Sequence, residues 1–234
     1  MSDPTPVTTT IDGDVAIVRI DDGKANALGH PAIDALNEAL DRAEDEAGAV
    51  VLVGRDGRFS AGFDLATMTA GPDSSLPLLS KGAELSFRLL TYPLPTVIAC
   101  TGHALAMGAI LLMSADLRIG ANGPYKVGMN EVAIGMPVPR FAVELARDRL
   151  APTHFVRAIQ LATVFDPAGA VGAGYLDRTV DDDVEGAAVA AAAELAAGLR
   201  IGAFRLTRSI MREDLVARLR AGLEWDLTTF TVDA

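Results

Sequence analysis

The sequence is poor in cysteine, and Cys100 is its only one, so no disulfide can form within the chain. Cys100 ends the apolar run Val97-Ile98-Ala99-Cys100, where a buried and unreactive thiol is the expected state. A reducing compartment is the simpler assumption for such a chain. We therefore expect a cytoplasmic protein.

Basic residues are also scarce. The chain has 20 Lys and Arg against 31 Asp and Glu, which gives a net charge of −11, and Lys occurs only at positions 24, 81 and 126. Nucleic-acid binding depends on clustered Lys and Arg, so we expect no nucleic-acid partner. An anionic ligand would have to be met by a few local cations or by backbone N–H groups.

Long apolar runs are missing as well. The Ala-rich tract at 187–197 is interrupted by Glu194 and is too short to cross a bilayer, so we expect no membrane partner. Residues 1–10 are polar and rich in Pro and Thr, without the apolar stretch of a secretory signal, and we predict a flexible leader. The acidic run 181–183 has no His or Cys beside it, which favours a solvated turn over a metal site.

Half of the residues are hydrophobic, which is enough for a large core. Short apolar or β-branched runs predict strands at 15–20, 50–53, 96–100 and 117–119. Apolar residues at helical spacing predict helices at 31–43, 108–115, 152–161, 167–173, 185–199 and 203–223. Strands that alternate with helices indicate an α/β fold with parallel strand pairing.

Three familiar chemistries fit the sequence poorly. Ser60 lies in Gly57-Arg58-Phe59-Ser60-Ala61-Gly62, where the first glycine is one position too far away for a nucleophile elbow. His103 with Asp116 as its orienting acid is a possible base, but a lone His after a buried strand is more often structural. Gly102 and Gly108 do not form the dinucleotide-binding Gly-x-Gly-x-x-Gly pattern.

A lone carboxylate with two backbone donors fits better. Glu131 lies in Asn130-Glu131-Val132-Ala133-Ile134-Gly135, and an acid in apolar surroundings gains the raised pKa of a general base. Gly62 permits a sharp turn that could point the N–H of Phe63 into a cleft. The helix predicted to start near Gly108 has unpaired N–H groups in its first turn. Two such donors could form an oxyanion hole, although ordinary strand-to-helix turns explain the pattern equally well.

Four motifs in order resemble the crotonase superfamily, the enoyl-CoA hydratase/isomerase family, from about Val15 to at least Arg208. They are Asn26-Ala27-Leu28, Phe59-Ser60-Ala61-Gly62-Phe63-Asp64-Leu65, Gly102-His103-Ala104-Leu105 leading to Asp116-Leu117-Arg118, and Asn130-Glu131 with Gly135. The resemblance implies a spiral of ββα turns, a C-terminal helical trimerisation region and an acyl-CoA thioester as substrate. It divides the chain into the leader at 1–10, a crotonase-like core at 11–200 and an oligomerisation segment at 201–234.

The resemblance also implies a site. The N–H groups of Phe63 and Met107 would hold the thioester oxygen, and Glu131 would be the catalytic acid/base. Met107 stands where the family usually has Gly, so we expect its side chain to crowd the cleft. Substrate would also contact Lys24, Ala25, Ala61, Asp64, Leu65 and Ile110, with Lys24 the candidate for a CoA phosphate.

One departure from the family pattern suggests the reaction. Family hydratases usually have a second catalytic Glu at the position of Ile110, and isomerases of 3-enoyl-CoA to 2-enoyl-CoA lack it. We therefore expect isomerisation with Glu131 alone, which needs no metal and no redox cofactor. Two alternatives stay open: a hydratase that uses Glu84 or Glu144 as the second acid, and a non-catalytic acyl-CoA binding protein. A homotrimer or a dimer of trimers is the expected assembly.

Overall fold

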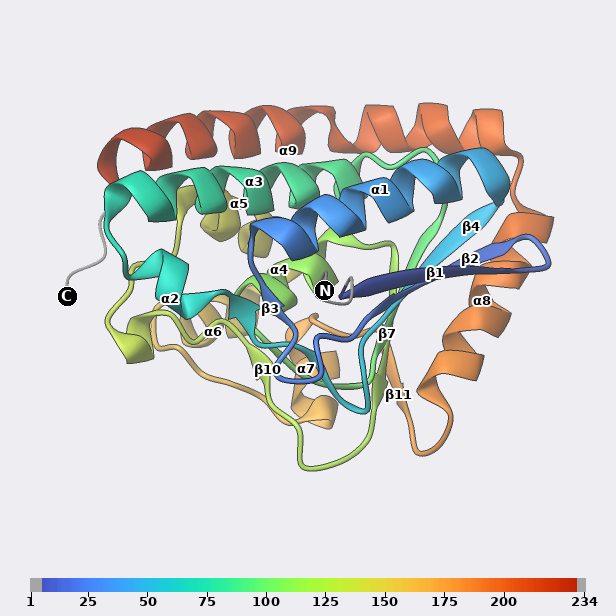
Figure 1. Ribbon diagram of the computed structural model, residues 1–234, viewed down its shortest axis with the longest axis horizontal. Helices are drawn as coiled ribbons and strands as arrows, with labels where there is room; N and C mark the ends of the chain where they lie inside the picture. The colour runs from blue at the N-terminus through green and yellow to red at the C-terminus, as the bar shows by residue number, and fades with distance from the viewer. Residues whose placement is uncertain (1–5, 231–234) are drawn as a thin grey trace, which may run out of the picture.

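The computed structural model describes residues 6–230, and its centre is a six-stranded sheet in the order β1-β2-β4-β7-β9-β11 (Figure 1). The strands are β1 (Val7–Asp12), β2 (Val15–Ile20), β4 (Ala49–Val53), β7 (Thr96–Cys100), β9 (Leu117–Ala121) and β11 (Arg178–Val180). Only the hairpin of β1 and β2 is antiparallel, and the remaining pairs in this sheet are parallel. The predicted parallel α/β architecture is therefore present.

The two central strands are buried on both faces. Alternate residues of β4 and β7 point to opposite sides, because side chains in a strand alternate with a period of two. Val51, Val97 and Ala99 pack toward α8 (Val184–Gly198). Leu52 and Ile98 belong to the larger core, which also holds buried residues of α1 (His30–Glu46), α3 (Pro72–Leu90) and α4 (Met107–Ser114).

Short strands follow the long ones and build a second layer. One small sheet has the order β10-β8-β5, formed by β10 (Val127–Gly128), β8 (Gly102–Leu105) and β5 (Gly57–Ser60). A two-stranded sheet pairs β3 (Ala27–Leu28) with β6 (Gly62–Phe63). The order β7, β8, α4 is a complete ββα turn of the expected spiral. The short strands turn the chain toward the site described below.

Helices cover the rest of the core. The chain forms α2 (Leu65–Met68), the 3-10 turn η1 (Val132–Ile134), α5 (Arg140–Arg149), α6 (Pro152–Ile159), α7 (Pro167–Ala173) and α9 (Ile201–Thr229). Figure 1 shows α9, in red, running along the same side of the molecule as α3 and α1. Its most extensive contact is with α5. Leu215, Leu219 and Leu223 of α9 are buried in the hydrophobic core.

One predicted boundary differs from the structure. The leader was predicted to span residues 1–10, but Val7–Asp12 forms β1, which pairs with β2 along its full length. The β-branched residues Val, Thr and Ile in this segment favour a strand, and their exposure alternates as expected at a sheet edge, which the prediction overlooked. Residues 1–5 and 231–234 lie outside the described part. The C-terminal segment from residue 201 packs on the core, while Leu206 and Ile210 remain exposed.

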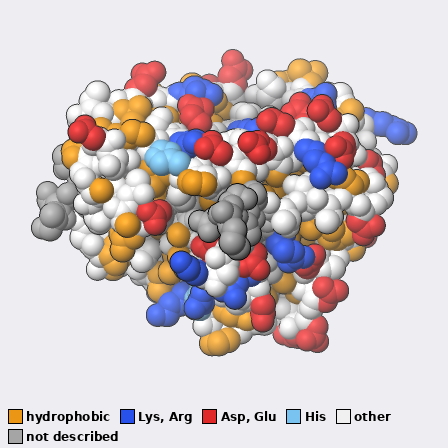
Figure 2. Space-filling view, in the orientation of Figure 1, with side chains coloured by type: hydrophobic (Ala, Val, Ile, Leu, Met, Phe, Trp, Pro, Cys, Tyr) orange, Lys and Arg blue, Asp and Glu red, His pale blue; other side chains and the backbone are white. Residues whose placement is uncertain are grey.

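Within residues 6–230, no helix by itself has the length and apolar character needed to cross a bilayer. The helices α8 and α9 meet that criterion only as a pair, and the chain bends by 105° between them. Acidic and basic side chains are interspersed on the face seen in Figure 2. Several of these charges form ion pairs, such as Arg19 with Glu185.

Candidate active site

A cavity of about 470 Å³ lies between the short strands, the η1 turn and the end of α9. Its wall is mainly apolar, and Asp64 and Glu131 are the two acidic residues that line it. The predicted residues Ala25, Ala61, Phe63, Leu65 and Ile110 line it as well. Segments from six separate parts of the chain thus meet at one apolar site.

Glu131 is the buried acid of this cavity. It precedes η1, and only 6% of its surface is exposed. Burial raises its pKa to about 7, because the charged form loses its water. Its Oε2 atom has no hydrogen-bond partner among the described residues. A carboxyl group in this state can both accept and return a proton near neutral pH.

Asp64 is in a different state. Its carboxylate caps the N-terminus of α2, accepting hydrogen bonds from Thr67 N at 2.9 Å and Thr67 Oγ1 at 2.6 Å. These bonds hold the pKa of Asp64 below its ordinary value. Its Oδ2 atom is engaged in helix capping and its pKa is lowered, so Asp64 is a weaker base than Glu131.

The two predicted backbone donors lie on segments that touch. Gly62 has φ of 99°, and a Cβ atom there would lie 2.7 Å from Ala106 Cβ and 3.2 Å from Met107 N. Asp64 N donates to Leu28 O of β3. Because N–H groups alternate in direction along a strand, the N–H of Phe63 points away from β3. Met107 is the first residue of α4, where N–H groups have no partner within the helix.

Two further features hold the start of α4 in place. A Cβ atom on Gly108 would lie 2.6 Å from Ser60 O, so only glycine allows this approach of α4 to β5. Ala106, which precedes α4, has φ of 49° and ψ of −119°, a sparsely populated conformation for alanine. Backbone strain at this turn is consistent with a role in aiming the next amide.

Two other polar residues of the motifs, Asn26 and Ser60, have structural roles. The Asn26 amide donates to Ile20 O at 2.7 Å and to Phe59 O at 3.2 Å, which ties three chain segments together. Ser60 is fully buried, and its hydroxyl donates to Asn26 O and accepts from Gly62 N. Ser60 thus shapes the turn before Phe63 and has no role as a nucleophile in this arrangement.

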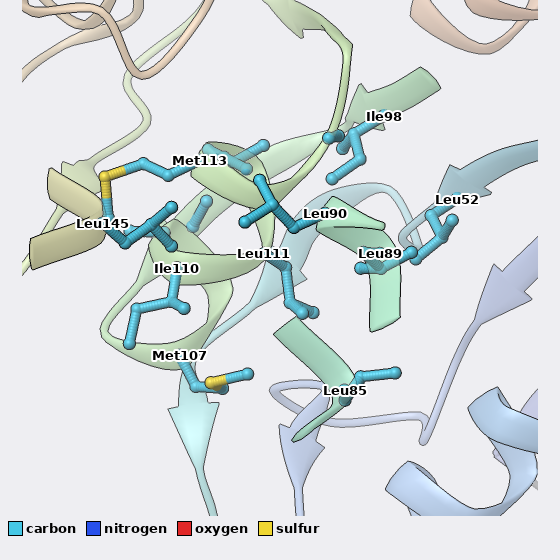
Figure 3. Close-up of a cluster of buried hydrophobic side chains, with 14 of the residues drawn as sticks. Leu52, Leu85, Leu89, Leu90, Ile98, Met107, Ile110, Leu111, Met113 and Leu145 are labelled. Carbon is cyan, nitrogen blue, oxygen red and sulfur yellow. The ribbon is translucent and has the colours of Figure 1, made fainter. Parts of the chain in front are cut away.

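The expected crowding by Met107 was wrong. Met107 is fully buried and its side chain does not line the cavity. It belongs to the apolar cluster in Figure 3, together with Leu85 and Leu111, and its Cε lies near Gly82 of α3. The Cα–Cβ bond at the start of α4 directs the side chain into the core, while Ala106 and Ile110 face the cavity.

Lys24 lies outside the cavity wall and is exposed. Its backbone carbonyl accepts from Arg55 Nη1 at 2.7 Å, and Arg55 also pairs with Asp21 at 3.3 Å. A second cation therefore stands beside Lys24, next to Ala25 of the cavity wall. The phosphate contact of Lys24 stays a prediction.

The alternative catalytic groups are placed elsewhere. His103 Nδ1 accepts from Lys126 N, and Asp116 is paired with Arg208 and Arg212, so these two residues form no triad. Glu84 pairs with Arg220 and Glu144 with Arg218, and neither acid lines the cavity. Ile110 is buried at the cavity wall where a second carboxylate was considered.

Comparison with known proteins agrees with this geometry. The profile of the family described as "Enoyl-CoA hydratase/isomerase" matches residues 10–232. The chain belongs to the enoyl-CoA hydratase/isomerase family. It is 29% identical over 222 residues to human mitochondrial enoyl-CoA delta isomerase 1, covering 92% of this chain and 73% of the human protein.

Solved structures of family members share the fold. An enoyl-CoA hydratase/isomerase family protein from Pseudomonas syringae superposes with a TM-score of 0.94 at 40% identity, covering 97% of this chain and 98% of the other. An enoyl-CoA hydratase from Mycobacterium marinum gives 0.91 at 44% identity, with 97% and 100% covered. The predicted crotonase-like fold is confirmed, and the chain is an enzyme of this family. Relatives named isomerase and relatives named hydratase are both similar to it.

Gly82 supports the site and was not predicted from the sequence. Gly82 lies in the middle of α3, and a Cβ atom there would lie 2.3 Å from Cε1 of the Phe63 ring. Because Gly82 has no side chain, the ring of Phe63 can pack against α3 at this point. This packing holds β6, the strand that carries the N–H group of Phe63. A glycine inside a long apolar helix is costly and was the available signal for a packing role.

Gly82→Ala should displace the Phe63 ring and with it the Phe63 amide. We expect kcat/KM on the enoyl-CoA substrate to fall by about 10- to 100-fold, because displacements of about 1 Å have effects of this size. Gly172→Ala in α7 is the matched control, since its Cβ atom would meet nothing within 4 Å. Equal activity of the two variants in steady-state assays would contradict this role of Gly82.

Glu131→Gln should change the pH dependence of stability. The folded-state pKa of Glu131 is raised from 4.5 to about 7, so stability is fully present below pH 4.5 and is lost as pH rises through about 7. Complete ionisation of Glu131 therefore lowers the free energy of unfolding by about 3 kcal/mol. We expect the variant to gain up to this amount over the wild type at pH 8.5 and nothing at pH 4, measured by urea unfolding. A gain independent of pH would show that ionisation of Glu131 is not its cause.

Proposed function

We propose that this enzyme isomerises 3-enoyl-CoA to 2-enoyl-CoA, with Glu131 carrying the proton. The observation that carries the proposal is the pairing of one buried, unpartnered carboxyl group with Ile110 in the same apolar cavity. A double-bond shift needs one group that removes a proton and gives it back. Addition of water needs a second acid/base group as well.

In the proposed reaction, a Glu131 oxygen takes a proton from C2 of the substrate. The electrons of the C–H bond move onto the thioester oxygen and form a dienolate, whose negative charge faces the N–H groups of Phe63 and Met107. Each donor of this type is worth about 3 kcal/mol in the transition state. The carboxyl group then returns the proton to C4, and the double bond ends between C2 and C3.

The pKa of about 7 suits this cycle. A carboxylate of ordinary pKa would be a weak base toward carbon, and a much stronger base would hold the proton too tightly to return it. The free Oε2 atom leaves the carboxyl group able to face C2 and then C4. The apolar wall keeps water away from the dienolate.

Hydration of 2-enoyl-CoA is the second candidate, because relatives named enoyl-CoA hydratase share up to 44% identity with this chain. It would require Asp64, the other acid of the cavity, to act despite its capping bonds to Thr67. The third candidate is a non-catalytic acyl-CoA binding protein. It would bind acyl-CoA in the same cavity, although the members of this family are enzymes.

The deciding experiment is a paired assay of the purified protein on a 3-enoyl-CoA and on a 2-enoyl-CoA. We expect isomerisation to rise through pH of about 7 as Glu131 loses its proton, and to fall by at least about 100-fold in Glu131→Gln. Hydration should be negligible in both proteins. Glu84→Gln, which removes an exposed acid outside the cavity, is the control and should retain wild-type rates.

Other outcomes would reject the proposal in distinct ways. Hydration that depends on Glu131 would identify a hydratase, and its loss in Asp64→Asn would name the second acid. Full isomerisation by Glu131→Gln would reject the one-carboxylate mechanism. Binding of acyl-CoA with no turnover on either substrate would favour the binding protein.

We also propose that the enzyme assembles through α9 as a trimer or a dimer of trimers. Leu206, Ile210 and Met211 are 64%, 68% and 75% exposed and lie near one another at helical spacing. Sedimentation velocity should give a mass of three or six chains, and Met211→Asp should lower it. A wild-type monomer at micromolar concentration would overturn the assembly.

A further inference from the structure

The cavity has a wall that comes from the far end of the chain. Phe230 follows the last turn of α9, is only 7% exposed and lines the same cavity as Glu131. Figure 1 shows this end of α9 at the edge of the molecule beside the start of α3, whereas α4 lies near the centre. The end of α9 that precedes Phe230 therefore lies away from α4, the helix that begins at Met107.

Phe230 is held there by polar contacts as well as packing. Its N–H donates to Asp226 O at 2.7 Å. The buried carboxylate of Asp226 accepts from Arg140 N at 2.7 Å and Phe141 N at 3.1 Å, at the start of α5. Leu223 and Leu227 of the same helix pack against the core. The end of α9 is thus tied to α5, and the ring of Phe230 is a fixed wall.

The path from the reacting carbon to Phe230 is apolar. The acyl chain continues from the carbon atoms that exchange the proton with Glu131, so it must leave the oxyanion donors through the rest of the cavity. The apolar side chains that line the cavity include Met68, Leu79, Met136, Pro137 and Phe230. These groups suit a hydrocarbon and offer no partner to a polar substituent.

We propose that Phe230 closes the acyl pocket and sets the longest acyl chain that the enzyme accepts. The substrate class is then an unbranched 3-enoyl-CoA of limited length. This inference rests on the proposed function for the identity of the reaction, but the contact between Phe230 and the acyl chain also affects binding alone.

The test compares kcat/KM for 3-enoyl-CoA substrates of about six to about sixteen carbons in the wild type and in Phe230→Ala. Each buried methylene contributes about fourfold to binding, so two additional methylenes in the enlarged pocket raise kcat/KM more than tenfold. We expect the ratio of long-chain to short-chain kcat/KM to increase by at least about tenfold in Phe230→Ala. Trp225→Ala removes another aromatic side chain of α9, one that is half exposed and outside the cavity, and should keep the wild-type ratio.

Two further measurements distinguish failure of the proposed reaction from failure of the proposed role of Phe230. Phe230→Leu keeps an apolar wall of smaller volume and should give an intermediate ratio, and it decides the question if Phe230→Ala does not fold. Calorimetric binding of saturated acyl-CoA thioesters should show the same change in chain-length preference. If no protein isomerises any substrate but the binding preference shifts, the proposed reaction fails and the role of Phe230 stands. An unchanged ratio, or an equal loss at every length, would overturn the role of Phe230.

Discussion

The close contact between two backbone segments is the constraint on which the site depends. Gly62 lies against Ala106 and Met107, and Gly108 lies against Ser60, so neither segment has room for a side chain at the contact. The contact places the turn before α4 beside β6, and Phe63 and Ala106 both line the cavity. Any Cβ atom at either glycine would separate them, since the nearest atoms would be at 2.7 Å and 2.6 Å.

A second constraint is the contrast between the two acids of the cavity. Asp64 satisfies its carboxylate locally at the start of α2, so it stays ionised and fixed. Glu131 is buried with one oxygen unpartnered, so its proton affinity rises to the range where it can act on carbon. Two carboxyl groups in one cavity therefore have different chemistry, because burial raises the pKa of Glu131 and hydrogen bonds from Thr67 lower the pKa of Asp64.

The support of the site comes from elements distant in sequence. Asn26 joins the ends of β2 and β5, and Gly82 of α3 leaves space for the Phe63 ring. The long helix α9 contributes twice, through its apolar contact with α5 and through Phe230 at the cavity wall. Packing of α9 on the core thereby couples the stability of the C-terminal segment to the shape of the cavity.

The sequence by itself determined the main layers and marked the buried acid that lines the cavity. Apolar runs such as 96–100 and breakers such as Pro95 act over a few residues, so β7 and α7 appear where they were predicted. The motifs likewise marked Glu131 and Ile110. Only the tertiary structure decided the direction of the Met107 side chain, the edge strand β1, and the roles of Gly82 and Phe230. These four features depend on contacts between segments far apart in the chain. Local sequence patterns do not determine which of these segments pack together.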